Sequence, residues 1–229
     1  MIFWHECMDS TFFIMQNPCI KNYPILTFYL VYVSIPNMLS FLNIMDYLHF
    51  YCAPCLLGKK PASLFSIPIE IYNKSQNEIE SLRVQGFCIH FLYELNKKAH
   101  LLVFSEQKTK ELFCEVEIKK AYEFFGYKDG FSFEDLKLVL FEKFSQFACK
   151  ELQQQNIDCF PHEVGLFLGY PPEDVLQYYT KKGRDYLFSG YWKVYTNPEK
   201  AIETFKMYDE CRNHFMNGVK ISFYNLLSA

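Results

Sequence analysis

His162 and Glu163 are the two side chains of this chain whose types and position best suit them to chemistry. They follow Pro161, and proline favours the first position of a helix, so the sequence predicts a short helix from Pro161 to Leu168. The positive end of the helix dipole favours the carboxylate of Glu163 and disfavours the charged form of His162. A neutral imidazole can act as a general base or bind a metal ion. We therefore predict a pocket near His162.

A structural role for the same two residues is the alternative. Consecutive residues of a helix point about 100° apart, so His162 and Glu163 cannot face each other as a catalytic pair. Glu163 would then accept hydrogen bonds from exposed backbone N–H groups at the helix start, while His162 would anchor the neighbouring loop. The sequence leaves both roles open.

Cys52 and Cys55 have the spacing of a redox dithiol. Such a site works when its first cysteine begins a helix that follows a strand, whereas here a helix is predicted before Cys52. A zinc site would need a second pair of ligands at comparable spacing, and the sequence has none. We expect two thiols packed in a turn near the core.

Lys60 ends the tripeptide Gly58-Lys59-Lys60, which is similar to the end of a phosphate-binding loop. The phosphate-loop pattern requires glycine where Ala53 stands and serine or threonine where Lys60 stands. Both requirements fail, so this type of loop is excluded. Lys60 stays a candidate only as a further member of a site that includes Cys52.

The charge and cysteine content narrow the classes of function. Net charge is −3, and the Lys and Arg residues are scattered, whereas nucleic-acid binding needs a concentrated basic face. We therefore predict no nucleic-acid partner. The nine cysteines are odd in number and irregularly spaced, which indicates free thiols in a reducing compartment rather than a disulfide framework. This predicts a cytoplasmic protein.

The N-terminal segment differs in character from the remainder. Its apolar run from Ile25 to Ile35 is shorter than the roughly 20 residues that a membrane span requires. Glu6 and Asp9 stand where a signal peptide would carry positive charge. We therefore predict neither a stable membrane span nor a signal peptide.

Two interpretations of this segment are open. The apolar run is rich in β-branched and aromatic residues, so it is compatible with a strand. We favour the second interpretation, in which translation begins at Met38 or Met45 and residues 1–37 are an extension that arises from the start site. Residues 38–229 are then expected to form a single domain, which is long enough to bury its own core.

Hydrophobic periodicity predicts the α+β class, with a small antiparallel sheet packed by about six helices. The sheet is expected to contain a hairpin, Gly86–Glu94 with Ala99–Phe104, and a third strand, Tyr186–Tyr195. Ser132 is a predicted N-cap, and Pro198 is the predicted first residue of the last helix, which Gly218 would follow. Cys55–Pro68 is predicted to be a loop with a short turn of helix. The predicted helices are Leu39–Tyr51, Ile69–Val84, Lys108–Phe125, Ser132–Gln154, Pro161–Leu168, Pro172–Lys182 and the helix after Asn197.

Three separated segments carry a resemblance to a known family. They are His49-Phe50-Tyr51-Cys52-Ala53-Pro54 with Gly58, Lys60-Pro61-Ala62 and Leu64-Phe65; Phe160-Pro161-His162-Glu163 with Gly165 and Phe167-Leu168-Gly169-Tyr170-Pro171; and Gly190-Tyr191-Trp192-Lys193-Val194-Tyr195. This pattern resembles a bacterial family known only as domain of unknown function 3793, over about Met38 to the C-terminal end. The resemblance implies a bacterial intracellular protein and implies no activity.

Two classes of function follow as hypotheses. The first is a non-catalytic module that binds a small ligand or a partner protein, without a cofactor. The second is an enzyme or a metal-binding protein that uses His162, Glu163, Cys52 and Lys60, with a metal bound near His162. These residues are far apart in sequence, so their convergence in space would separate the two classes.

Overall fold

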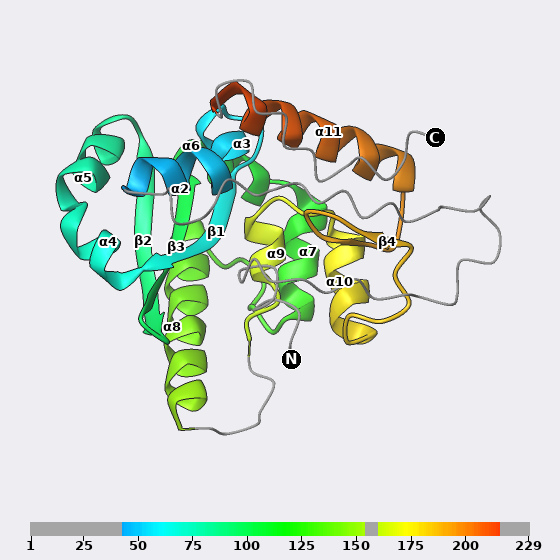
Figure 1. Ribbon diagram of the computed structural model, residues 1–229. Helices are drawn as coiled ribbons and strands as arrows, with labels where there is room; N and C mark the ends of the chain where they lie inside the picture. The colour runs from blue at the N-terminus through cyan, green and yellow to red at the C-terminus, as the bar shows by residue number, and fades with distance from the viewer. Residues whose placement is uncertain (1–42, 154–159, 216–229) are drawn as a thin grey trace.

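A three-stranded antiparallel sheet organises the fold in the computed structural model, which describes residues 43–153 and 160–215 (Figure 1). The strand order is β1-β3-β2, so β3 is central and hydrogen-bonded on both sides. The predicted N-terminal extension and the predicted stop at Gly218 lie outside the described residues. The strands are β1 (Ala62–Pro68), β2 (Phe87–Leu95) and β3 (Lys98–Ser105).

The hairpin of β2 and β3 confirms the prediction from alternation. Its two-residue turn consists of Asn96 and Lys97, which both have positive φ, at 52° and 59°. Two-residue hairpins favour turns of this kind because their backbone twist matches that of the strands. The predicted α+β class is also confirmed.

The third strand was predicted at the wrong place. Tyr186–Tyr195 contains only two short strands, β4 (Phe188–Ser189) and β5 (Lys193–Val194), which pair with each other in a separate sheet. The third strand of the main sheet is β1, in the segment predicted to be a loop. Pro61 and Pro68 suggested a loop, but an edge strand tolerates proline at its ends.

Ten helices accompany the strands in the described part of the chain. Two long predicted helices are each split in two, at Ser75 and at Cys114-Glu115. The helices are α2 (Ile44–Tyr51), α3 (Ala53–Leu56), α4 (Ile69–Lys74), α5 (Gln76–Val84), α6 (Glu106–Phe113), α7 (Val116–Phe124), α8 (Phe133–Leu152), α9 (Val164–Phe167), α10 (Pro172–Thr180) and α11 (Pro198–Phe215).

The longest helix, α8, begins at its predicted cap. The Ser132 hydroxyl accepts a hydrogen bond from the Asp135 backbone N–H, and the Asp135 carboxylate accepts one from the Ser132 N–H. This reciprocal pair is a capping box, which satisfies backbone donors that the first turn leaves open. No helix in the described part of the chain is both long and apolar enough to cross a membrane.

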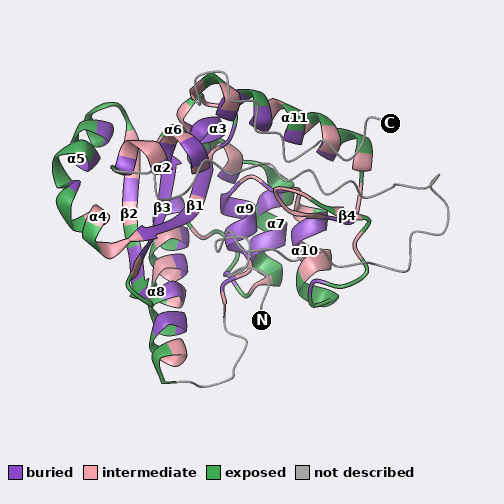
Figure 2. Cartoon of the chain, viewed as in Figure 1, coloured by how far each residue is buried: buried purple, intermediate pink, exposed green. Residues whose placement is uncertain are grey.

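The sheet separates two hydrophobic cores (Figure 2). On one face Phe65, Leu101 and Val103 pack against α2, α3 and α5. On the other face Leu102 and Phe104 pack against α7, α8 and α9. Alternate residues of β3 therefore point into different cores, as the pleat of a strand requires.

A β-bulge changes which face the second half of β2 presents. The register moves from Phe91 opposite Leu101 to Tyr93 opposite His100. An extra residue in one strand reverses the alternation beyond it. Strict alternation would place Tyr93 on the face of Phe91, but Tyr93 instead stacks on His100, with ring centroids 4.3 Å apart.

One buried carboxylate attaches the β4–β5 hairpin to the rest of the fold. Asp174, in the first turn of α10, accepts hydrogen bonds from Trp192 Nε1 at 2.7 Å, Tyr195 N at 2.9 Å and Thr196 N at 2.8 Å. Thr196 Oγ1 donates a fourth bond at 3.0 Å. Because a buried carboxylate is costly without donors, this set of bonds fixes the hairpin against α10.

Candidate functional site

Glu163 lies in a turn before α9, not inside a helix. Turn hydrogen bonds begin at Pro161, but α9 itself begins at Val164, three residues later than predicted. The carboxylate caps no backbone N–H; it is buried, pairs with the Lys143 ammonium and accepts a 3.4 Å hydrogen bond from Tyr127. The predicted bonds from Glu163 to the helix start are therefore wrong, and α9 with its four residues gives little dipole.

His162 is half-buried among aromatic rings beside that ion pair. Its ring centroid lies 5.4 Å from that of Phe160 and 5.3 Å from that of Tyr178. Nothing in these contacts directs the imidazole toward Cys52. In the described residues, no three His, Cys, Asp or Glu side chains gather as a metal site would require.

Cys52 and Cys55 are both completely buried at the two ends of the short α3 segment. Burial raises the pKa of Cys52 well above its usual range and raises that of Cys55 to about 12. A thiol is a nucleophile only as its thiolate, so neither side chain fits the dithiol chemistry that their spacing suggested. This agrees with the expectation of two thiols packed in a turn.

Lys60 is a buried cation at the outer edge of β1. Its ammonium lies 4.9 Å from the ring centroid of Tyr170 and 5.8 Å from that of Tyr208. Desolvation lowers the pKa of Lys60 to about 8; the nearby Cys55 and Cys52 raise it and Arg212 lowers it. Lys60 and Cys52 are therefore neighbours.

The four candidate residues do not form one site. Cys52 belongs to the core on one face of the sheet, whereas Val164, next to Glu163, belongs to the core on the other face. The structure thus brings Cys52 and Lys60 together, and it places Glu163 with Lys143 elsewhere.

A cavity of about 650 Å³ lies at the opposite edge of the sheet, between β2 and α8. His90 forms part of its wall and stacks on Phe141, with ring centroids 3.8 Å apart and ring planes within 13°. The lining combines apolar and charged side chains from α5, β2, β3, α6 and α8. Its residues are Arg83, Gly86, Phe87, Cys88, Ile89, His90, Phe104, Glu106, Glu134, Lys137, Leu138 and Phe141.

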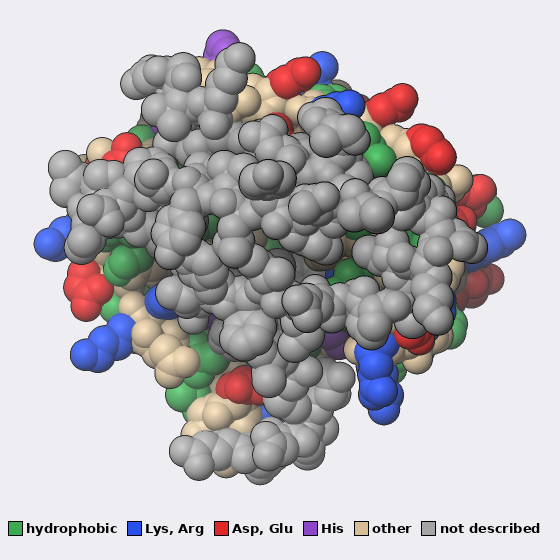
Figure 3. All heavy atoms as spheres, turned by 45° about the vertical axis from the view of Figure 1, so that its right-hand side comes forward, with side chains coloured by type: hydrophobic (Ala, Val, Ile, Leu, Met, Phe, Trp, Pro, Cys, Tyr) green, Lys and Arg blue, Asp and Glu red, His purple; other side chains and the backbone are tan. Residues whose placement is uncertain are grey.

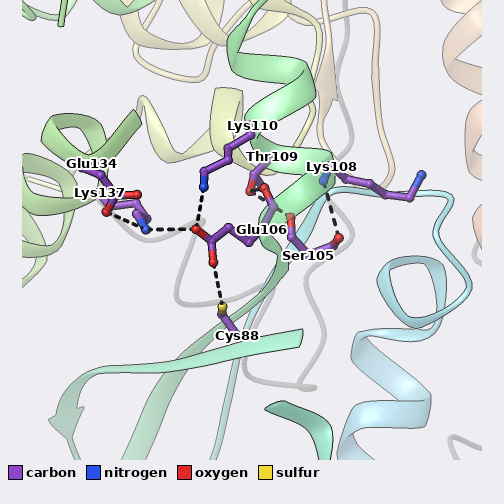
Figure 4. Close-up of polar contacts among 8 residues, drawn as sticks. All are labelled: Cys88, Ser105, Glu106, Lys108, Thr109, Lys110, Glu134 and Lys137. Carbon is purple, nitrogen blue, oxygen red and sulfur yellow. Dashed lines mark hydrogen bonds and ion pairs between the residues drawn. The ribbon is translucent and has the colours of Figure 1, made fainter. Parts of the chain in front are cut away.

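Glu106 is the centre of the polar contacts in this wall, with side chains pointing toward it from three other places in the chain (Figure 4). Its Oε1 lies 2.9 Å from Lys110 Nζ and 3.8 Å from Lys137 Nζ, and its Oε2 accepts a 3.9 Å hydrogen bond from Cys88 Sγ. Lys137 also pairs with Glu134 at 2.9 Å. The hydrogen bond from Lys110 and the charge of Lys137 lower the pKa of Glu106.

The cavity contains groups that sequence reasoning missed. Strict alternation along β2 puts Cys88 and His90 on one side of the strand, but this pattern alone does not indicate a cavity. Their encounter with Glu106 and Lys137 depends on the packing of α6 and α8 against the sheet, which no local pattern predicts. The cavity lining does not include His162, the residue near which a pocket was predicted.

The three segments quoted for the family resemblance meet in space around Lys60. A Cβ added at Gly169, where φ is +80°, would lie 2.7 Å from Pro61 Cδ, so the Pro61 loop and the Gly169 turn are in direct contact. Tyr170 in turn packs on Trp192, with ring centroids 5.1 Å apart. The first motif therefore touches the second, and the second touches the third.

Comparison with known families gives one match. The model of a family described as "Protein of unknown function (DUF3793)" matches residues 48–224. The chain belongs to this family. No curated protein and no solved structure matches the chain. The matched segment includes both edge strands of the sheet, Lys60 and the residues that line the cavity beside β2. The family description assigns none of them a role.

Proposed function

We propose that this DUF3793 protein is a non-catalytic binding module, and that the cavity between β2 and α8 takes a small uncharged ligand with a flat apolar part. The volume of about 650 Å³ supports this size class, because small-molecule sites commonly measure roughly 300–1,000 Å³.

The main support for an uncharged ligand is that the charged side chains in the cavity wall are paired. The four charged side chains that line the cavity are two cations and two carboxylates, so their formal charges cancel. Lys137 lies between Glu106 and Glu134, and Arg83 pairs with Glu80 at 3.1 Å. An ionic ligand would have to displace one of these partners, whereas an uncharged ligand leaves every pair intact.

The apolar part of the wall favours a flat ligand. Phe87, Phe104 and Leu138 line the cavity together with the stacked rings of His90 and Phe141. Desolvation lowers the pKa of His90, with a further contribution from Arg83, so the imidazole is neutral at neutral pH. A neutral ring stack offers an apolar surface on which a planar ligand packs favourably.

The protonation states in the cavity support binding rather than catalysis. Burial and the charge of Glu106 raise the pKa of the Cys88 thiol, so it remains protonated at neutral pH. Lys110 and Lys137 keep Glu106 ionised. A protonated thiol is a poor nucleophile, and a strongly paired carboxylate is a poor general base.

The competing hypothesis of an enzyme that uses His162, Glu163, Cys52 and Lys60 gains no support from their positions. That hypothesis required the four side chains to lie in one cleft. The sheet instead lies between Cys52 and the segment that contains Glu163. Figure 3 shows basic and acidic side chains intermixed on the visible face. This mixture gives no support for a nucleic-acid partner.

Matched sets of small aromatic amides, carboxylates and amines test the proposal. Ligand-observed NMR should give more hits, and tighter ones, among the amides than among their charged counterparts.

Leu138→Glu adds a carboxylate to the cavity wall and should abolish amide binding. Leu152→Glu is the matched control, because Leu138 and Leu152 are both exposed on α8, at 69% and 67%, and only Leu138 lines the cavity. Preferential binding of the charged compounds, or equal effects of the two variants, would contradict the proposal.

A further inference from the structure

We propose that Lys60 is a nucleophilic amine that forms a Schiff base with a small aldehyde or ketone. This site lies at the β1 edge of the sheet, whereas the cavity proposed for the uncharged ligand lies at the β2 edge, so the two proposals are independent. The inference begins from a buried cation that has no carboxylate partner among the residues that the structure describes.

The environment of the Lys60 side chain is apolar and aromatic. Only 7% of the residue is exposed, and the rings of Tyr170 and Tyr208 lie on it at 4.9 and 5.8 Å. Within residues 43–153 and 160–215, no carboxylate pairs with its ammonium. Cation–π contacts offset part of the desolvation of a charge but do not replace a carboxylate.

The groups that face Lys60 come from three elements. Cys52 and Cys55 lie at the ends of α3, Tyr170 precedes α10, and Tyr208 and Arg212 belong to α11. Burial raises the pKa of both thiols, so they bring no negative charge to the site. Arg212 adds positive charge, and the carboxylate of Asp209 lies 3.6 Å from its Nη1. The balance of charge favours the uncharged amine.

Backbone hydrogen bonds fix the loop from which the Lys60 side chain starts. The N–H groups of Lys59 and Lys60 both donate to the Pro54 carbonyl, at 2.7 and 3.0 Å. Pro61, the next residue, packs against the turn at Gly169. The Lys60 stem thus starts from a loop that is tied to α3 on one side and to the α9–α10 turn on the other.

The uncharged amine is the reactive form, because its lone pair attacks the carbonyl carbon. With a pKa of about 8, roughly 9% of Lys60 is uncharged at pH 7, against about 0.03% for a lysine that titrates at 10.5. The nucleophilic fraction is therefore about 300 times larger. In the reaction a C=N bond replaces the C=O bond, and the carbonyl oxygen leaves as water with the two hydrogens of the amine. Because only 7% of Lys60 is exposed, the partner is limited to a small carbonyl compound.

Reductive alkylation tests this inference directly. The folded full chain is treated briefly at pH 7 with acetaldehyde and sodium cyanoborohydride, which reduces the Schiff base to a stable secondary amine. Peptide mapping then compares ethylation of Lys60 with that of Lys59, its exposed neighbour. We expect Lys60 to be modified at least about ten times faster than Lys59, and its rate to reach a plateau at a lower pH.

Two variants complete the test. Lys60→Met should lose the fast modification, while Lys59→Met should keep it, and circular dichroism establishes that each variant is folded. The inference is overturned if Lys60 reacts no faster than Lys59, if it reacts only after unfolding in urea, or if Lys60→Met retains the fast phase. Because none of these measurements involves the cavity beside β2, failure here leaves the ligand proposal untouched.

Discussion

Replacing Lys60 by methionine should make the protein more stable at neutral pH. Methionine has a similar length and no charge, so the variant keeps the packing of the stem and removes a cation from an apolar site. Lowering the pKa of a buried lysine from 10.5 to about 8 corresponds to about 3 kcal/mol of unfavourable free energy at pH 7. The lost contacts with Tyr170 and Tyr208 act in the opposite direction. We expect a net gain of about 2 kcal/mol.

The gain should depend on pH in a defined direction. Since the folded-state pKa is the lower one, the folded protein binds fewer protons than the unfolded chain between about pH 8 and 10.5. The free energy of unfolding contributed by Lys60 therefore rises with pH across this window. The penalty is complete below pH 8 and absent above about pH 10.5. Lys60→Met should accordingly exceed the wild type at pH 7 and equal it, or fall slightly below it, at pH 10.5.

Urea unfolding of wild type, Lys60→Met and Lys59→Met at pH 7 and pH 10.5 measures these differences. Other groups titrate in the same range, but they are common to all three proteins, so only differences between proteins are compared. Lys59→Met should change little, because its side chain is exposed. A Lys60→Met variant that is less stable than wild type at pH 7, or a difference that does not change with pH, would refute the reasoning.

Three further substitutions test the packing around these sites, each measured as the change in urea midpoint. Asp174→Ala leaves several buried donors without their acceptor and should cost about 3 kcal/mol; a loss below about 1 kcal/mol would contradict the role of this carboxylate. Gly190→Ala places a methyl group 2.2 Å from Cε2 of the fully buried Phe205 and should cost about 1–3 kcal/mol, whereas a neutral effect would show that the ring yields freely. Glu163→Gln keeps the shape of the side chain but removes the charge that pairs with Lys143, so we expect a loss of about 1–2 kcal/mol; an unchanged midpoint would argue against a stabilising ion pair.

Local signals predicted the elements whose causes are local. The hairpin followed from alternation and a short polar turn, and the start of α8 followed from the chemistry of Ser132 and the acidic residues after it. The first residue of α11 is Pro198, as predicted from the preference of proline for that position. In each case the residues that determine the structure lie within a few positions of one another.

Elements that depend on tertiary contacts were predicted less well. β1 has apolar residues on both faces because a core covers each side of the sheet, so its alternation is weak. The aromatic alternation around Trp192 arises because these rings pack on Phe205 and Tyr170, not because they form a long strand. Packing across the chain, rather than local pattern, decides both.

The candidate residues show the same division. Lys60 and Glu163 were among the candidate residues, but the sequence did not predict that both would be buried charges. The partners of Glu163, Lys143 and Tyr127, lie 20 and 36 residues away, and nothing local points to them. The encounter of Lys60 with Tyr208 depends on how α11 packs beside α2 and α3 (Figure 1).

The order of the strands has a consequence for how the chain acquires its structure. β2 and β3 are adjacent in sequence and need only a two-residue turn to pair, whereas β1 must close a loop of about thirty residues to reach the far side of β3. We therefore expect the hairpin to form first and β1 to join it later, together with α3 and the Lys60 loop. The cavity beside β2 is completed without β1, while the environment of Lys60 comes into being only with the last strand to dock.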